Sequence, residues 1–116
     1  MSDTKQAVDA PKLNLDIVKI SSEFRAIAAA NKWQAYHSPK NLAAAVAVEA
    51  GELLAEFQWL TEDDSRSLSA AQKSQVADEI ADIFMYLTEL SLQLDIDMSD
   101  AVNAKIEKNK QRFKTL

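Results

Sequence analysis

The sequence lacks cysteine altogether and has only one glycine, two prolines and one histidine among its 116 residues. Without cysteine there are no disulfides, thiolate metal sites or cysteine nucleophile. A β-rich fold needs turn residues at intervals of about 8 to 12 positions, and this sequence has too few of them. No run of about 18 apolar residues occurs, and no basic segment with a following apolar stretch opens the chain. These absences predict a helical, cytoplasmic protein with no membrane partner.

The length and the charge distribution narrow the class further. A chain of 116 residues suits one domain, and we expect a flexible N-terminal lead-in over 1–12 followed by a single domain over 13–116. Residues 41–100 hold thirteen acids against two bases, a net charge of −11, whereas residues 101–116 have a net charge of +4. Proteins that bind duplex nucleic acid present a dominant basic face. The pattern therefore argues against duplex nucleic acid and suits a small polyanion that arrives with a divalent cation.

Apolar spacing predicts an all-α fold of four helices with short connections. The expected ranges are 15–35, 39–60, 70–94 and 100–113, with a charged loop over 61–67. Ser38 before Pro39 is a helix start, Ser69 with Gln72 forms a capping box, and Ser99 is expected to cap the last helix. Such a short four-helix bundle-like subunit leaves apolar faces uncovered, so we expect a homo-oligomer, either a dimer or a tetramer.

Acidic residues interrupt two of the most apolar stretches of the chain. Glu49, Glu52 and Glu56 stand at i, i+3 and i+7 and therefore share one helix face. Glu79 and Asp82 repeat the i, i+3 spacing on the next long helix. Carboxylates in such surroundings lose hydration and repel one another unless a cation lies between them. A ligand set made only of oxygens favours Mg²⁺, with Mn²⁺ as the alternative.

A solvated helix face and a di-iron centre are the alternatives to a magnesium site. One Glu-x-x-Glu pair is usually a solvated helix face, but two pairs within apolar runs favour a metal site. A ferritin-like di-iron site needs Glu-x-x-His on two helices, and the single histidine, His37, lies in a predicted turn. Gly51 costs a helix about 1 kcal/mol relative to alanine, so we expect another backbone or a ligand to approach it closely.

The acidic pattern resembles that of a known family. Glu49-Ala-Gly-Glu52 and, after 26 intervening residues, Glu79-Ile-Ala-Asp82 are similar to the Glu-x-x-Glu…Glu-x-x-Asp pattern of MazG-like nucleoside triphosphate pyrophosphohydrolases. The similarity is closest to the dCTP pyrophosphatase branch and covers nearly the whole chain from about residue 14. The further segments that carry it are Trp33-Gln-Ala-Tyr-His37-Ser-Pro-Lys-Asn41-Leu, Glu56-Phe-Gln-Trp59 and Lys105…Asn109-Lys-Gln-Arg112-Phe.

The resemblance implies an enzyme that hydrolyses nucleoside triphosphates to the monophosphate and pyrophosphate. It implies Mg²⁺ ligands and catalytic residues at Glu49, Glu52, Glu79 and Asp82, without showing which of them activates water. The expected role is house-cleaning of deoxynucleotides such as dCTP or modified forms. The chain departs from the resemblance in having one domain where full-length MazG has two, and in having Phe24 where the animal dCTP enzymes have histidine. The preferred base is therefore not carried over.

Aromatic and basic residues supply the remaining candidates for substrate binding. These are Trp33, His37, Trp59, Tyr86, Lys105, Asn109 and Arg112. By composition the tryptophans suit a core or a subunit interface; by the resemblance, at least one stacks on a nucleobase. His37 either satisfies a turn or contacts nucleotide, and Tyr86 shares the face of the Glu79–Asp82 pair and is expected near the sugar.

The basic candidates form one stripe of the last predicted helix. Lys105, Asn109 and Arg112 stand at i, i+4 and i+7. Basic residues in a last turn also suit the helix dipole. We nevertheless expect Lys105 and Arg112 to meet phosphate, because the acidic region has little positive charge of its own.

Two rival functions remain. Instead of an enzyme, the chain would be a catalytically inactive nucleotide- and metal-binding oligomer with a regulatory role, or a structural oligomerisation module whose acids are solvated. The sequence leaves open the base and sugar of the substrate, dimer against tetramer, and a site within one subunit against a shared one.

Overall fold

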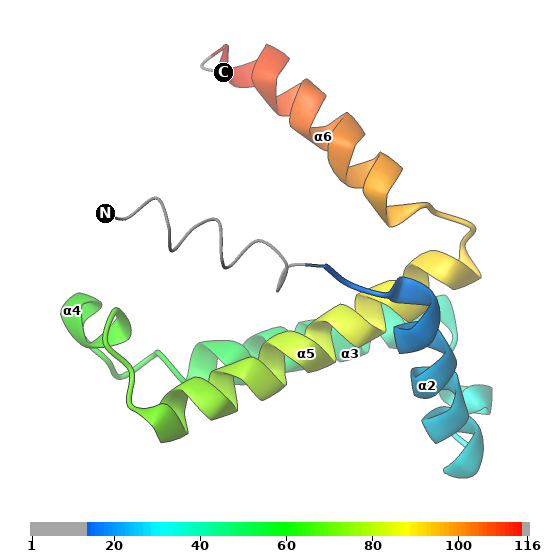
Figure 1. The fold of residues 1–116 in the computed structure, drawn as a ribbon, viewed down its shortest axis with the longest axis horizontal. Coiled ribbons are helices and arrows are strands. Elements are labelled where there is room, and N and C mark those ends of the chain that lie inside the picture. Colours follow the sequence, from blue (N-terminus) through cyan, green and yellow to red (C-terminus); the bar gives the residue numbers. More distant parts are fainter. Residues whose placement is uncertain (1–13, 115–116) are drawn as a thin grey trace.

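The computed structural model describes residues 14–114, which form helices and one 3-10 turn and contain no strand. The elements are α2 (Ile17–Ala30), η2 (Gln34–Tyr36), α3 (Pro39–Ala55), α4 (Glu62–Ser65), α5 (Ala70–Gln93) and α6 (Met98–Phe113), as Figure 1 shows. The predicted all-α fold is confirmed. The predicted lead-in over 1–12 lies outside the described residues.

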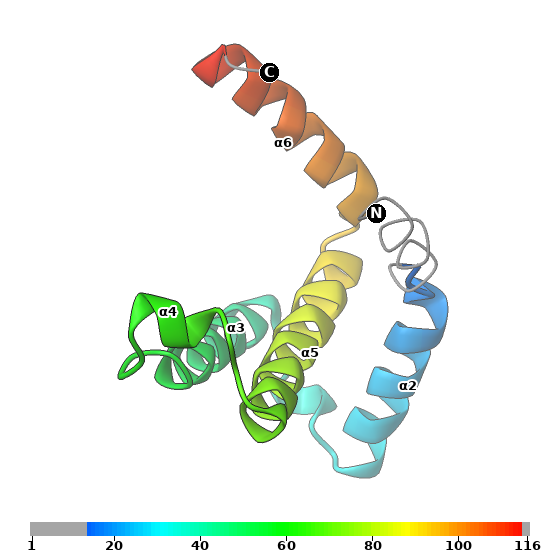
Figure 2. The ribbon, with the colours of Figure 1, turned by 60° about the vertical axis from the view of Figure 1, so that its left-hand side comes forward.

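The packed part of the subunit consists of α3 and α5, which lie side by side, with α2 against one end of the pair (Figures 1 and 2). Phe24 and Ala28 of α2 are buried there together with Leu42 near the start of α3. Thr88 and Glu89 of α5 complete the buried set. The hydroxyl of Thr88 donates to the carbonyl of Phe84 one turn earlier, at 2.8 Å, which satisfies its polar atom.

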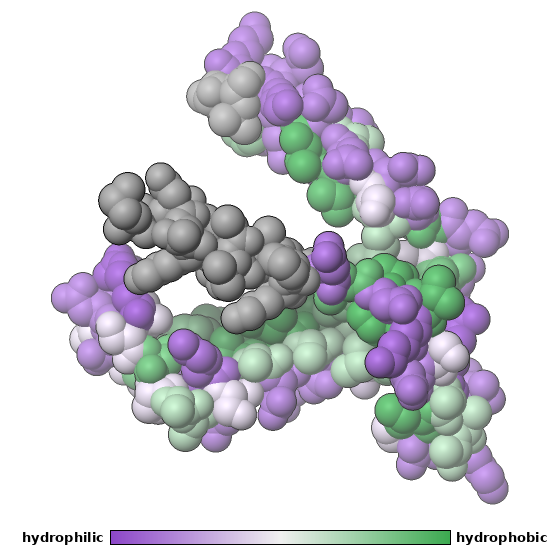
Figure 3. Space-filling model, viewed as in Figure 1, coloured by the Kyte–Doolittle hydropathy of each residue, from purple (hydrophilic) through white to green (hydrophobic). Residues whose placement is uncertain are grey.

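The last helix does not close a bundle within the chain. After α5, Asp95 adopts a positive φ of 54° and turns the chain, and α6 projects away from the α3–α5 pair (Figure 2). The apolar side chains of α6 remain more than a third exposed, at Val102, Ile106 and Phe113. Figure 3 shows this hydrophobic surface on α6 among hydrophilic neighbours. The chain therefore packs three of the four expected long helices against one another.

Helix starts agree with the sequence prediction at two of three positions. The side chain of Ser38 accepts a hydrogen bond from the backbone of Asn41, and Ser69 forms the predicted capping box with Gln72. The prediction of Ser99 as the cap of α6 is wrong. Asp97 takes that role two residues earlier by accepting from the backbone N–H of Asp100 at 2.9 Å.

Helix ends agree less well. The first helix, predicted to reach residue 35, ends at Ala30, because Lys32 has a positive φ of 59° and breaks the helix before η2 begins. The second ends at Ala55 rather than near residue 60. The predicted loop over 61–67 contains the single turn α4, whose N-cap is Thr61.

None of the helices described over residues 14–114 is both long and apolar enough to cross a membrane.

Candidate active site

Three carboxylates meet between α3 and α5, and we call them the acidic cluster: Glu49, Glu79 and Asp82. One oxygen from each lies within 4.8 Å of the others. All three residues are partly buried. Oε2 of Glu79 is fully buried and has no hydrogen-bond partner in the described part of the chain. Because buried acceptors are almost always satisfied, this oxygen indicates a missing partner, which is either a hydrogen-bond donor or a cation.

The electrostatics of the acidic cluster agree with its geometry. The pKa of Glu49 is raised to about 7, first because burial disfavours its charged form, and then because Glu79, Glu52 and Asp82 lie close to it. Carboxylate oxygens at this spacing suit a hard cation such as Mg²⁺ or Mn²⁺. The donor set and the unpartnered oxygen of Glu79 therefore both fit a divalent ion.

Glu52, the fourth predicted ligand, lies one turn beyond Glu49 on α3 and is exposed. Its carboxylate adds to the raised pKa of Glu49 but is not among the three whose oxygens meet. The structure thus gathers three of the four predicted ligands and leaves Glu52 at the rim. Gly51 beside it is also exposed, and a Cβ built there would meet no atom within 4 Å. Nothing in the described subunit makes the close approach predicted at Gly51.

Four rings gather beside the acidic cluster, and we call them the aromatic cluster: Phe24, Trp33, His37 and Tyr86. The ring of His37 stacks on Phe24 with centroids 5.7 Å apart and an interplanar angle of 12°. Tyr86 meets both of these rings edge-on, at 5.6 Å and 6.2 Å, and Trp33 lies 6.1 Å from His37. Three of the predicted substrate-binding residues are thus brought together.

A hollow of about 240 Å³ lies beside the aromatic cluster and reaches Asp82 of the acidic cluster. It is lined by Phe24, Ile27, Trp33, Asp82, Met85 and Tyr86. Tyr86 stands one turn after Asp82 on α5, and its pKa is raised, first by burial and then by the charges of Glu49 and Asp82. A flat apolar group placed in the hollow would lie against aromatic side chains and next to the carboxylate of Asp82.

The other predicted binding residues lie elsewhere in the subunit. Trp59 is 87% exposed and follows the C-terminal end of α3, whereas Trp33 precedes its start. The 17 residues of α3 span roughly 25 Å at 1.5 Å per residue, so the two tryptophans lie at opposite ends. Lys105, Asn109 and Arg112 are on α6, which points away from the α3–α5 pair (Figure 1).

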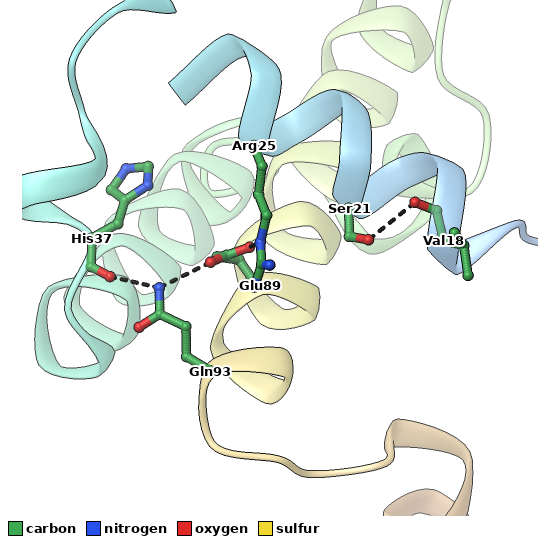
Figure 4. Close-up of polar contacts among 6 residues, drawn as sticks. All are labelled: Val18, Ser21, Arg25, His37, Glu89 and Gln93. Atoms are coloured by element: carbon green, nitrogen blue, oxygen red, sulfur yellow. Dashed lines mark hydrogen bonds and ion pairs between the residues drawn. The ribbon is translucent and has the colours of Figure 1, made fainter. Parts of the chain in front are cut away.

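A polar network next to the aromatic cluster was not predicted from the sequence. Nε of Arg25 donates to Oε1 of Glu89 at 2.8 Å. The side-chain amide of Gln93 donates both to Oε2 of Glu89, at 2.9 Å, and to the backbone carbonyl of His37, at 2.7 Å (Figure 4). The available signal was the position of Glu89 within an apolar run, seven residues after Asp82 and therefore on nearly the same helix face.

A comparison with known families identifies the family of this chain. Residues 44–115 match the MazG-like family. The chain belongs to the MazG-like family. The matched range begins within α3 and includes the whole acidic cluster. The resemblance inferred from the two acidic pairs is thereby confirmed.

Individual relatives of this MazG-like chain are similar over most of its length. It is 33% identical over 100 residues to dCTP pyrophosphatase 1 of Mus musculus and 32% identical to the Homo sapiens protein of the same name. Both matches cover 84% of this chain but only 57% of the relative. The crystal structure of a pyrophosphatase from Archaeoglobus fulgidus is 33% identical, with a TM-score of 0.77, and the match covers 86% of this chain and 94% of that one.

Proposed function

We propose that this MazG-like chain hydrolyses a nucleoside triphosphate to the monophosphate and pyrophosphate. The observation that carries the proposal is the acidic cluster, whose buried Glu79 oxygen lacks a partner in the described residues. Relatives named as pyrophosphatases over most of the chain support it. The substrate class we propose is deoxynucleotides such as dCTP, or modified forms of them, drawn from the cytoplasmic pool as house-cleaning.

The acidic cluster would hold the divalent cation, Mg²⁺ or alternatively Mn²⁺, with Glu52 joining it from the rim. When bound, the ion neutralises charge on the phosphate oxygens and orients them for attack by water. A carboxylate oxygen of the acidic cluster that is not needed for the ion would accept the proton of the attacking water.

The aromatic cluster would hold the nucleoside. Trp33 lines the hollow beside Asp82, and its ring would stack on the base. Tyr86 also lines the hollow and lies within the electrostatic reach of Glu49 and Asp82, so the sugar would lie next to it. His37 does not line the hollow, but its ring contacts the other three rings of the aromatic cluster and would hold them in place. Stacking on aromatic faces tolerates several bases, so the polar groups around the hollow would set the preference.

The proposed assembly is a homo-oligomer, a dimer or a tetramer. The apolar residues of α6 and the exposed Val48 and Leu54 of α3 need a covering surface. Since α6 points away from its own α3–α5 pair, Lys105, Asn109 and Arg112 would act in the site of a neighbouring copy, where Lys105 and Arg112 would bind phosphate. Trp59 would likewise lie at a contact between copies.

The test is a panel of ribo-, deoxyribo- and modified nucleoside triphosphates incubated with the protein, with and without Mg²⁺, and analysed by ion-exchange chromatography. Monophosphate and pyrophosphate should appear in equal amounts and only with the ion. Glu52→Ala should weaken the reaction, whereas Glu62→Ala, which removes an exposed acid on α4, should leave it unchanged. Binding of nucleotide without any product would overturn the enzymatic proposal in favour of a regulatory binding protein.

A further inference from the structure

We propose that Glu89 and Gln93 are positioning residues of the nucleotide site. Through Arg25 and the backbone of His37 they fix the aromatic cluster beside the acidic cluster and so set affinity and selectivity for the base. In the described part of the chain neither residue forms a hydrogen bond with the acidic cluster, so their effect would be on the geometry of the aromatic cluster beside the hollow. The kinetic part of this inference rests on the proposed function, whereas the geometric part does not.

The network links three segments that are far apart in the sequence. Glu89 and Gln93 belong to α5, Arg25 to α2, and His37 to the turn before α3. Among residues 14–114, every side-chain hydrogen bond between positions more than five apart belongs to this network. Its bonds are short, at 2.8 Å from Arg25 to Glu89 and 2.7 Å from Gln93 to His37. The relative placement of these segments therefore depends, among polar contacts, on these two residues.

The burial of Glu89 indicates that this residue does more than hold α2 and α5 together. Only 6% of the residue is exposed. Burial works to raise its pKa, but hydrogen bonds from Arg25 and Gln93 and the charge of Arg25 lower it overall, so the group is ionised. An apolar residue of similar size often holds packed elements together as well as a buried ion pair does. A directional carboxylate instead fixes the orientation of Arg25 and Gln93.

His37 connects the hydrogen-bond network of Glu89 and Gln93 to the aromatic cluster beside the hollow. Gln93 holds the backbone of His37, whose ring stacks on Phe24 and meets the edge of Tyr86. Asp82, Tyr86, Glu89 and Gln93 follow one another along one face of α5, at i, i+4, i+7 and i+11. The same helix face thus aligns an ion ligand, a ring of the aromatic cluster and the network that holds the facing turn. Without the Gln93 bond, no side-chain hydrogen bond described in the structure would join the His37 turn to α5.

The kinetic test compares Gln93→Met, which keeps the length of the side chain but removes its donor, with the wild type. We expect KM for the preferred nucleotide to rise about tenfold, with kcat within about threefold. Discrimination between bases should fall, and the Mg²⁺ concentration for half activity should stay the same. Glu89→Gln, which keeps volume, should show the same pattern. Asp63→Asn is the matched control, because it breaks an exposed ion pair with Arg66 at 3.1 Å.

A second measurement does not depend on catalytic activity. His37 is the only histidine of the chain, so its ring gives a unique NMR signal. Stacking on Phe24 should displace that signal by ring current, and Gln93→Met should move it towards the position of a free histidine, whereas Asp63→Asn should not. A signal and a KM that both stay unchanged in Gln93→Met would overturn the proposal. So would a lower Tm with unchanged KM and unchanged base discrimination, because that is the result of a purely structural role.

If the proposed function is wrong, the results differ from those of a wrong positioning role. In that case neither the wild type nor any variant would release pyrophosphate, and the role in nucleotide selectivity would be overturned with it. The His37 signal would still move in Gln93→Met, which would support the geometric part alone.

Discussion

The carboxylate of Glu79 distinguishes the acidic cluster from an ordinary acidic helix face. Its neighbour Asp78 is exposed, whereas one oxygen of Glu79 is buried without a partner among the described residues. A buried unsatisfied group costs about 1–3 kcal/mol. A cation between Glu79, Glu49 and Asp82 would remove that cost, so the same residues that destabilise the subunit alone would stabilise it with the ion bound.

The raised pKa of Glu49 leads to a pH-dependent prediction. Between the ordinary carboxyl pKa of 4.5 and the folded value of about 7, the folded protein without metal binds a proton that the unfolded chain does not. Its free energy of unfolding should therefore fall as pH rises through this window. Saturating Mg²⁺ favours the charged form, so the increase in Tm on adding Mg²⁺ should be larger at pH 8 than at pH 6.

Thermal unfolding at the two pH values, with and without Mg²⁺, measures both effects. Glu49→Gln removes the titrating group and should flatten the pH dependence that Glu49 contributes in the absence of the ion. An increase in Tm with Mg²⁺ that is equal at pH 6 and pH 8 would contradict the role of Glu49.

At the scale of single residues, the sequence predicted the acidic cluster but not the exposure of Glu52 beside it. Acids at i and i+3 within apolar runs are visible in the sequence, which is how Glu49, Glu79 and Asp82 were found. The exposure of Glu52 depends on the rotation of α3 about its axis, which the packing against α5 decides. Glu89 was missed because its partner Arg25 stands 64 positions away in the sequence.

At the scale of elements, α5 carries two carboxylates of the acidic cluster, one ring of the aromatic cluster and both Glu89 and Gln93, so its stability supports the whole candidate site. Its N-terminus is held by a reciprocal capping box in which Ser69 and Gln72 bond each other's backbone. Ser69→Ala should lower the free energy of unfolding by about 1 kcal/mol. Ser74→Ala, at an exposed position of the same helix, should change it by less than about 0.5 kcal/mol. Urea denaturation followed by circular dichroism compares the two, and equal effects would contradict the role of the cap.

Helix starts were more predictable than helix ends. A start depends on local side chains, as Ser38 and Ser69 show, and the one error arose because Asp97 and Ser99 are equally good caps at neighbouring positions. The early end of α2 depends on the left-handed backbone of Lys32, for which lysine has no particular preference. No glycine marked that position in the sequence.

At the scale of the whole molecule, α6 is the element whose apolar face has no packing partner among the described residues of the chain. Its apolar residues Val102 and Ile106 lie one turn apart and remain exposed. If they form a contact between copies, Ile106→Asp should shift the protein from oligomer to monomer, because a carboxylate would be buried without a partner. Gln111→Asp adds the same charge at another exposed position of α6 and should leave the assembly intact.

Light scattering coupled to size-exclusion chromatography measures the mass of each variant. A wild-type protein that elutes as a monomer at micromolar concentration would contradict the assembly. The sequence predicted the need for a partner from the small size of the bundle, but it could not predict that α6 projects from the subunit, because the direction of a helix after a turn is set by the turn at Asp95 and by what it packs against.

The most direct test of the central claim is Mg²⁺-dependent pyrophosphate release by the wild type, Glu79→Gln and Asp78→Asn, measured on one triphosphate substrate. We predict that Glu79→Gln loses about 100-fold or more in kcat/KM, equivalent to about 2.7 kcal/mol of transition-state stabilisation, while Asp78→Asn retains wild-type activity. Equal activity of Glu79→Gln and the wild type would contradict the claim, because the buried oxygen of Glu79 would then have no part in holding the ion.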